Sequence, residues 1–377
     1  MKNFIWLTVV LSLCPLAYGD QRGRSLPLPG DPGAVVNADF DQDGFQDLAM
    51  IVAKKDESRS IIILWGDLQK KFSLSTEVSM QTIIPEPGLR PSMRDTTSRS
   101  IVVADFNGDG KMDLGTSVGM ALNQGTRKFS WVDLKNKTTK SIQPVGLVII
   151  SGQKNLVVRV DGGIDACTHK SCTALIRSEF LKDGLLLPSE MIVFDFDNDK
   201  KLDILAGSEF LDAQNSYLWL GKDLFKETYL LQDVSPVDIQ LFDINGDGRI
   251  DFLAQVKEFI SDFPSETRVF LNKPEGLELT QTFSNFDNHN DNATVMKKSD
   301  GCFKYYQIGV DRGFGVLETK KNSAGECVFE SVKPQFKSVA SVLGIGIQCL
   351  SLSKDRCHLV ARVPMTSVEQ GSLWIEN

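Results

Sequence analysis

Carboxylates recur at fixed intervals in four short segments of this chain, and their spacing suits metal coordination. Each segment follows the pattern D-x-[DN]-x-D-x-x-x-D, with acidic or amide side chains at positions 1, 3, 5 and 9. Alternate side chains of a tight loop converge on one point, and the backbone carbonyl of position 7 can add another oxygen. An all-oxygen set of this kind selects Ca²⁺, whereas Mg²⁺ keeps several of its waters. The pattern therefore predicts up to four Ca²⁺ sites.

We number these segments loop 1 to loop 4. They are Asp39–Asp47, Asp105–Asp113, Asp195–Asp203 and Asp243–Asp251. Position 6 is glycine in three loops, which permits a positive φ in the turn, but Lys200 stands there in loop 3.

Two other interpretations of the acidic segments are weaker. An EF-hand needs Glu at loop position 12 and flanking helices, but position 12 holds Met50, Thr116, Ala206 and Ala254. Simple Asp-rich surface turns do not account for four loops in register, each preceded by an apolar run.

The elements around the loops are expected to be short β-strands. An apolar run such as IVVA or MIVF precedes each loop, and DLAMIVA, DLGTSV, DILAGS or DFLAQV follows it. A second phrase then follows, such as ILWGDLQKKFSL or YLWLGKDLFKETYL. Each unit therefore predicts four strands, with the first two joined by the acidic loop. No helical period is sustained, so an all-β chain is expected.

The spacing of the loops predicts further units without the motif. The loops start 66, 90 and 48 residues apart, so a unit of about 48 residues leaves room for a worn repeat between loops 2 and 3. Strand-like runs after residue 288 make two more units. The prediction is a seven-bladed β-propeller of four-stranded blades, because radial closure protects sheet edges. The blades are expected at about 31–92, 93–140, 141–188, 189–235, 236–288, 289–336 and 337–377. The last lacks an outer strand, which residues 20–30 can supply to close the ring.

The first residues predict export. Lys2 precedes an apolar run over 4–13, and Ala17-Tyr18-Gly19 fits the small-x-small rule for cleavage. Residues 1–19 are therefore interpreted as a signal peptide and 20–377 as a single propeller domain. The mature chain is expected to be secreted, periplasmic or extracellular, with no transmembrane segment.

Six cysteines remain after residue 19, and an even number in an exported chain indicates disulfides. Many connectivities are open, and neighbour pairing is the simplest: Cys167–Cys172, Cys302–Cys327 and Cys349–Cys357. All six lie in the units without an acidic loop, so we expect disulfides to stabilise those units and calcium the others. A zinc site at Cys167 and Cys172 with His169 would lack a fourth ligand.

Composition excludes several functions. The net charge of −8 and the pI of 5.1 oppose nucleic-acid binding. Three histidines make a His-rich catalytic metal site improbable. The chain also has no G-x-S-x-G, H-E-x-x-H or phosphate-binding loop motif.

The acidic loops and their strand flanks resemble the FG-GAP or VCBS repeats of integrin α-subunit-type β-propellers. The resemblance covers about residues 31–285 by motif, and 286–377 only by strand pattern. It implies Ca²⁺ bound between the first two strands of a blade, with position 7 acting through its carbonyl. The implied ligands are Asp39, Asp41, Asp43, Phe45 and Asp47 in loop 1, and Asp105, Asn107, Asp109, Lys111 and Asp113 in loop 2. In loop 3 they are Asp195, Asp197, Asp199, Lys201 and Asp203, and in loop 4 Asp243, Asn245, Asp247, Arg249 and Asp251.

The resemblance specifies fold and calcium rather than activity. Related propellers often recognise proteins or glycans through loops on one face, so the expected function is a non-catalytic binding or adhesion module for an extracellular or cell-surface glycan or protein. The segments 84–98, 133–142 and 284–300 are candidate contact loops. The alternative is a propeller-type enzyme, such as a polysaccharide lyase or phosphodiesterase, with no catalytic residue identified. Trp65, Trp219 and Trp374 occupy equivalent third-strand positions, which favours core packing over a sugar platform.

Overall fold

The computed structural model describes most of the chain after residue 22. The described residues are 23–54, 56, 58–68, 72–80, 101–134, 145–160, 163–177, 191–207, 216–226, 228–231, 239–257, 264–284, 293–309, 313–325, 327–329, 346–353, 356–363 and 372–376. The predicted signal peptide lies outside them, as do most residues of the three candidate contact loops. No helix among the described residues is long and apolar enough to cross a membrane.

Antiparallel strands make up the fold, and most sheets contain four strands that are consecutive in the chain. Two sheets are formed by β2 (Gly30–Ala38), β3 (Asp47–Lys54), β4 (Arg59–Trp65) and β5 (Leu74–Ser79), and by β6 (Ile101–Ala104), β7 (Asp113–Thr116), β8 (Gly119–Gly125) and β9 (Lys128–Asp133). The next contains β10 (Val145–Ile150), β11 (Gln153–Val160), β12 (Gly163–Cys167) and β13 (Cys172–Arg177).

The following sheets repeat this order. One contains β14 (Met191–Phe194), β15 (Asp203–Gly207), β16 (Ser216–Trp219) and β17 (Thr228–Leu231), with the short 3₁₀ turn η3 (Gly221–Asp223) after β16. The others contain β18 (Ile239–Phe242), β19 (Asp251–Lys257), β20 (Pro264–Lys273) and β21 (Gly276–Ser284), and β22 (Ala293–Lys297), β23 (Phe303–Gly309), β24 (Gly313–Lys321) and β25 (Cys327–Phe329).

The remaining sheet joins the two ends of the described chain. It contains β26 (Gly346–Ser353), β27 (Arg356–Val363) and β28 (Ser372–Glu376), and β28 pairs with β1 (Gly23–Pro27). The β1–β28 register runs from Gly23 opposite Glu376 to Pro27 opposite Ser372. The outer strand of this sheet therefore comes from the N-terminal side of the chain.

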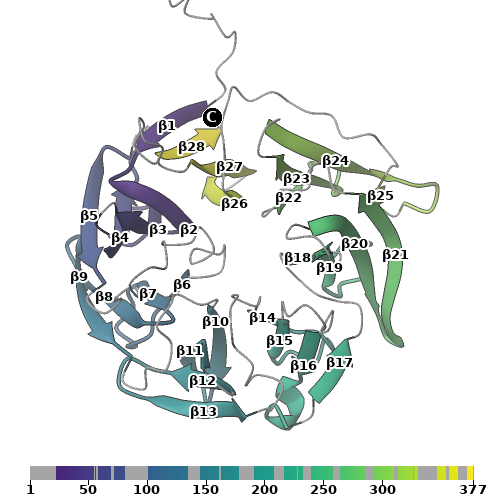
Figure 1. Ribbon diagram of the computed structural model, residues 1–377, viewed down its shortest axis with the longest axis horizontal. Helices are drawn as coiled ribbons and strands as arrows, with labels where there is room; N and C mark the ends of the chain where they lie inside the picture. Colours follow the sequence, from purple (N-terminus) through teal and green to yellow (C-terminus); the bar gives the residue numbers. More distant parts are fainter. Residues whose placement is uncertain are drawn as a thin grey trace, which may run out of the picture.

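The sheets are arranged around a common centre, with the first strand of each consecutive sheet innermost and the fourth strand outermost (Figure 1). Innermost strands of neighbouring sheets contact one another, for example β2 with β6 and β26, and β22 with β18 and β26. The sequence-based expectation of an all-β chain built from four-stranded antiparallel sheets is confirmed.

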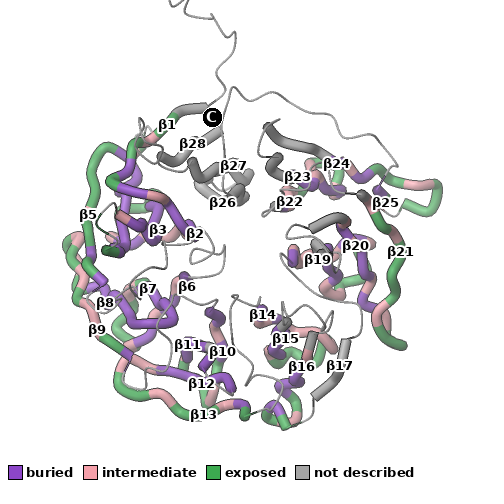
Figure 2. The backbone as a smooth tube through the Cα atoms, in the orientation of Figure 1, coloured by how far each residue is buried: buried purple, intermediate pink, exposed green. Residues whose placement is uncertain are grey.

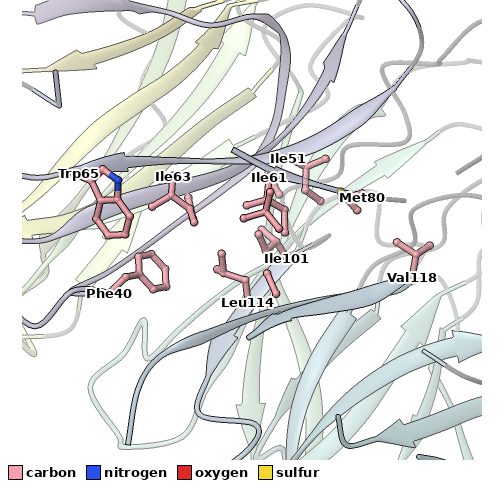
Figure 3. Packing of buried hydrophobic residues seen from close by; sticks show 13 residues of the cluster. Phe40, Ile51, Ile61, Ile63, Trp65, Met80, Ile101, Leu114 and Val118 are labelled. Atoms are coloured by element: carbon pink, nitrogen blue, oxygen red, sulfur yellow. The ribbon is translucent and has the colours of Figure 1, made fainter. Parts of the chain in front are cut away.

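The core lies between sheets, so inner strands are buried on both faces. Along β3 and β4, Ala49, Ile51, Ile61 and Ile63 face the β6–β9 sheet, where they pack with Leu114 and others (Figure 3). The alternate residues, such as Leu48 and Met50, belong to a separate cluster on the opposite face. Two buried faces explain why these strands are continuous apolar runs rather than alternating ones. Outer strands such as β5 and β9 carry more exposed residues (Figure 2).

Two of the predicted disulfides are present. Cys167–Cys172 closes the turn between β12 and β13, and Cys302–Cys327 links the start of β23 to β25. Each joins strands of one sheet, as neighbour pairing predicts. The side chains of Cys349 and Cys357 lie outside the described set, so their pairing stays a prediction.

Two of the three equivalent tryptophans support the core interpretation. Trp65 ends β4 and is 3% exposed, and Trp219 ends β16 and is 1% exposed. These two rings are core residues rather than a surface platform. The side chain of Trp374, in β28, is not among those described.

Candidate metal-binding loops

Each acidic loop joins the first and second strands of its sheet. Loop 1 lies between β2 and β3, loop 2 between β6 and β7, loop 3 between β14 and β15, and loop 4 between β18 and β19. This is the location that the repeat pattern predicts. The β10–β11 and β22–β23 connections, at Ser151-Gly152 and Lys298–Cys302, lack the motif.

The aspartate at position 1 organises every loop. Its two oxygens accept the backbone N–H groups of positions 5 and 6, at N···O distances from 2.8 to 3.2 Å. In loops 2 and 4 the N–H of position 4 also donates to it, at 2.7 Å. The four aspartates are Asp39, Asp105, Asp195 and Asp243. This carboxylate therefore folds the backbone tightly around the loop centre.

The tight turn requires a left-handed backbone at two positions. Position 6 has positive φ in all four loops, and Lys200 adopts it at +70° where the other loops use glycine. Lys200 still donates its N–H to Asp195 at 2.8 Å, so loop 3 keeps the geometry of the others. Position 4 also has positive φ, at Gln42, Gly108, Asn198 and Gly246. The sequence indicated the requirement at position 6 but not the one at position 4, where Gly or Asn stands in loops 2 to 4 and Gln42 in loop 1.

The aspartate at position 9 is the most buried part of each loop. Asp47, Asp113, Asp203 and Asp251 are each 0% exposed. One oxygen accepts the N–H of position 2 and the other accepts an N–H at the end of the third strand, at distances from 2.6 to 2.9 Å. Those third-strand donors are Gly66, Asn123, Gly221 and Asn272. Position 9 thus ties its loop to the third strand of the same sheet.

Burial makes these carboxylates harder to ionise. It raises the pKa of Asp47 to about 6, and the neighbouring charges of Asp41 and Asp43 add to the effect. Burial also raises the pKa of Asp113, Asp203 and Asp251. A cation at the loop centre would favour the charged form of each.

Loops 1 and 3 each bring three carboxylates together. Oxygens of Asp39, Asp41 and Asp43 lie within 4.8 Å of one another, and so do oxygens of Asp195, Asp197 and Asp203. In loop 3, Oδ1 of Asp197 is buried without a hydrogen-bond partner. An oxygen that is buried without a donor, among other carboxylate oxygens, fits a hard divalent cation.

The other predicted side-chain ligands make hydrogen bonds within their own loops, and among the described residues no group of three converging carboxylates is found in loops 2 and 4. The side chains of Asn107 and Asn245 occupy position 3 in loops 2 and 4, and each Oδ1 accepts the N–H of position 5 at 3.0 Å. The position 5 carboxylates of Asp43, Asp109, Asp199 and Asp247 accept the N–H of position 7 at 2.8 to 2.9 Å. The position 7 residues are Phe45, Lys111, Lys201 and Arg249. Their N–H groups are used within the loop, and their carbonyls stay predicted ligands.

Comparison with known proteins identifies the repeat. A family model described as an FG-GAP-like repeat matches residues 39–116 and 195–254. The first match begins at Asp39 and spans loops 1 and 2, and the second begins at Asp195 and spans loops 3 and 4. Two regions of this chain therefore match the FG-GAP-like repeat. The resemblance drawn from the sequence is confirmed in these two regions.

No curated protein matches the sequence. Among solved structures, the chain is similar to the crystal structure of BBS1N in complex with ARL6DN, soaked with lead. The TM-score is 0.52 and the sequence identity 12%, over 94% of this chain and 96% of that chain. At that identity the likeness concerns the fold alone, which is propeller-like.

Side chains from the next sheet hold three of the FG-GAP-like loops. The carbonyl of position 2 accepts the Asn123 amide in loop 1, at 2.7 Å, and the Asn272 amide in loop 3, at 2.6 Å. In loop 2, Nδ1 of His169 lies 3.3 Å from the carbonyl oxygen of Phe106. These contacts could not be seen in the sequence, because the partners are 83, 76 and 63 residues apart.

Two basic side chains also contact position 3 of the FG-GAP-like loops. Nε of Arg127 lies 2.7 Å from Oδ2 of Asp41 in loop 1, and Nζ of Lys222 lies 2.9 Å from Oδ2 of Asp197 in loop 3. Loops 1 and 2 are further joined by Gln42, whose side-chain amide donates to the carbonyl of Gly110 at 3.1 Å.

Proposed function

We propose that this protein is a secreted, calcium-stabilised β-propeller that acts as a non-catalytic binding module for an extracellular or cell-surface glycan or protein. The observation that carries the proposal is the fourfold recurrence of one loop backbone at the same strand connection, held each time by the position 1 aspartate, with three carboxylates gathered in loops 1 and 3. A set of surface turns without a shared ligand would not need the same backbone conformation four times.

Calcium would be held by the side chains at positions 1, 3, 5 and 9 and by the carbonyl of position 7. When bound, the ion supplies positive charge that offsets the repulsion among the carboxylates of each loop. The chain itself provides the rest: position 1 folds the loop, and position 9 fixes it to the third strand. At a free calcium concentration 100-fold above the dissociation constant, each site would stabilise the fold by about 2.7 kcal/mol.

We further propose that the sheets are the blades of a closed seven-bladed ring, with blade boundaries as the repeat pattern predicts. The pairing of β1 with β28 supports closure, because it completes the sheet that contains both ends of the described chain. The disulfides within the β10–β13 and β22–β25 sheets support an oxidising compartment. They also support a division in which calcium stabilises four blades and disulfides stabilise the others.

A rigid ring with loops on its faces suits recognition of a partner, since binding residues concentrate on loops that a stable scaffold positions. The experiment that tests this function is binding of the labelled mature chain to a broad glycan array and to immobilised cell-surface proteins, in calcium and in EDTA. The double variant Asp43→Ala/Asp109→Ala removes one predicted calcium ligand from loop 1 and one from loop 2, and it serves as the matched control. Selective binding that is lost in EDTA and weakened in the control would support the proposal. Turnover of any bound glycan, or binding unaffected by EDTA and by the control, would contradict it.

A further inference from the structure

Position 3 is the one predicted side-chain ligand position at which the four loops differ in charge. It is Asp in loops 1 and 3, at Asp41 and Asp197, and Asn in loops 2 and 4, at Asn107 and Asn245. An Asp contributes a full negative charge to a cation site, whereas an Asn contributes only the dipole of its amide. Ligand charge is a main determinant of calcium affinity. Taken alone, the sequence would therefore give loops 1 and 3 tighter sites than loops 2 and 4.

The structure compensates this difference. In both loops that have Asp at position 3, Oδ2 pairs with a basic side chain, at 2.7 Å to Arg127 and 2.9 Å to Lys222. The environment of the other oxygen, Oδ1, differs between the two aspartates. In Asp41 it accepts the N–H of Asp43 at 3.3 Å, and in Asp197 it is buried without a hydrogen-bond donor among the described residues. In loop 4 the side-chain amide nitrogen of Asn245 donates instead to Oδ2 of Asp247, at 3.0 Å.

Arg127 is held in place for this contact by a strained turn of the neighbouring sheet. Thr126 and Arg127 form the β8–β9 turn, with φ of 51° and 62°, which non-glycine residues adopt only at a cost. The guanidinium lies 5.0 Å from the centre of the Trp65 ring, and the Arg127 carbonyl lies 3.3 Å from Oγ1 of Thr76. Trp65 lies beside Phe40 at one end of the core cluster (Figure 3). The side chain of Asp41 is only 9% exposed and that of Arg127 is 37% exposed, so the carboxylate end of this ion pair is shielded from solvent.

Lys222 reaches the equivalent oxygen by a different route. It lies in η3, the 3₁₀ turn after β16, within the same sheet as loop 3, whereas Arg127 comes from the sheet next to loop 1. Two unrelated segments thus deliver a cation to the same atom of the same loop position. Position 5 carboxylates also have basic neighbours: Nη2 of Arg127 lies 3.6 Å from Oδ2 of Asp43 in loop 1, and Nζ of Lys111 lies 3.0 Å from Oδ2 of Asp109 in loop 2.

We propose that Arg127 and Lys222 are affinity-setting residues, which cancel the extra charge at position 3 and bring calcium binding at loops 1 and 3 close to that at loops 2 and 4. This inference rests on the proposed calcium sites and adds residues that no ligand pattern includes. Its consequence is that all four loops lose and gain calcium over a similar concentration range, so the ring is stabilised as a unit.

The test is a charge cycle at each loop in the full mature chain, read by calorimetric titration with CaCl₂. Arg127→Gln should tighten one binding step about tenfold, because the position 3 charge is no longer cancelled. Asp41→Asn should weaken that step by a similar factor. The double variant Asp41→Asn/Arg127→Gln gives loop 1 the uncharged position 3 of loops 2 and 4, and its affinity should return to within about twofold of the wild type. Lys222→Gln and Asp197→Asn provide the same cycle at loop 3.

A second readout separates this role from a merely structural one. In EDTA, Arg127→Gln should lower the melting temperature, because Asp41 loses its cation, although the same variant binds calcium more tightly. If Arg127 only stabilised the fold, Arg127→Gln would lower both the melting temperature in EDTA and the affinity for calcium. Lys128→Gln, which changes the exposed neighbour in sequence, is the matched control and should change neither value.

The possible outcomes are distinct. Wild-type protein that takes up no calcium would overturn both the proposed function and this inference. Wild-type protein that binds calcium, with Arg127→Gln and Lys222→Gln unchanged or weaker in affinity, would overturn the inference and leave the proposed function standing.

Discussion

The buried aspartate at position 9 is expected to stabilise the fold even without metal, and Asp113→Ala tests this. Asp113 is 0% exposed, and its oxygens accept the N–H groups of Phe106 at 2.9 Å and Asn123 at 2.8 Å. The substitution leaves two N–H groups without an acceptor, at about 1–3 kcal/mol each. Part of this loss is recovered because the charge no longer has to be buried, which is the cause of the raised pKa of Asp113. We expect a net loss of about 3 kcal/mol.

The assay is urea and thermal unfolding in EDTA, so that the loss cannot arise from calcium. For a chain of this size, ~3 kcal/mol corresponds to about 4 °C in melting temperature. The control is Asp109→Ala in the same loop, whose side chain is 34% exposed and whose removal should cost little in EDTA. Both Asp113→Ala and Asp109→Ala should bind calcium more weakly than the wild type, because each removes a predicted ligand of loop 2. An Asp113→Ala protein that unfolds like the wild type in EDTA would refute the structural role of position 9.

Three further outcomes are expected. Burial raises the pKa of Asp47 to about 6, above the ~3.9 of an unfolded Asp, so Asp47 contributes stability that appears as pH falls from 7 toward 4. Urea unfolding in EDTA at pH 7 and pH 5 should show this gain in the wild type and a smaller one in Asp47→Asn; equal gains would contradict it. Lys200→Gly should stabilise the protein by about 0.5 kcal/mol by relieving the left-handed backbone, and Gly110→Lys should destabilise it; the reverse order in urea unfolding would count against loop strain. Deleting residues 20–27 should lower the melting temperature by several degrees, because β28 loses its partner strand, whereas deleting only 20–22 should not; equal melts would argue against a stabilising role for β1.

The sequence was sufficient for the local features of this fold. The pattern of apolar runs around each acidic segment predicted the strands on either side of loops 1 to 4, because strand and turn signals act over a few residues. It also predicted the Cys167–Cys172 and Cys302–Cys327 pairs, whose partners lie within one repeat. Lys200 looked like a break in the pattern, yet the hydrogen bonds of Asp195 hold it in the conformation of the missing glycine.

Features that depend on the packing of neighbouring sheets could not be predicted. The amide of Asn123 reaches loop 1 across 83 residues, and Arg127 reaches it across 86. Nothing in the residues near Asp41 indicates where its cation comes from, because that depends on how one sheet lies against the next. The second role of position 9 was also hidden, since the pattern presents this aspartate as a ligand and gives no sign of its third-strand donors.

The pairing of β1 with β28 has a mechanical consequence. Gly23 lies opposite Glu376, so the segments that enter β1 and leave β28 do so at the same end of the ladder. A pulling force applied through those two segments would load one hydrogen-bonded pair at a time, from Gly23 toward Pro27, instead of shearing all five residue pairs together. The β1–β28 pair, within the sheet that joins the two ends of the described chain, is therefore the place at which tension opens the molecule first, while the sheets that carry the acidic loops stay intact.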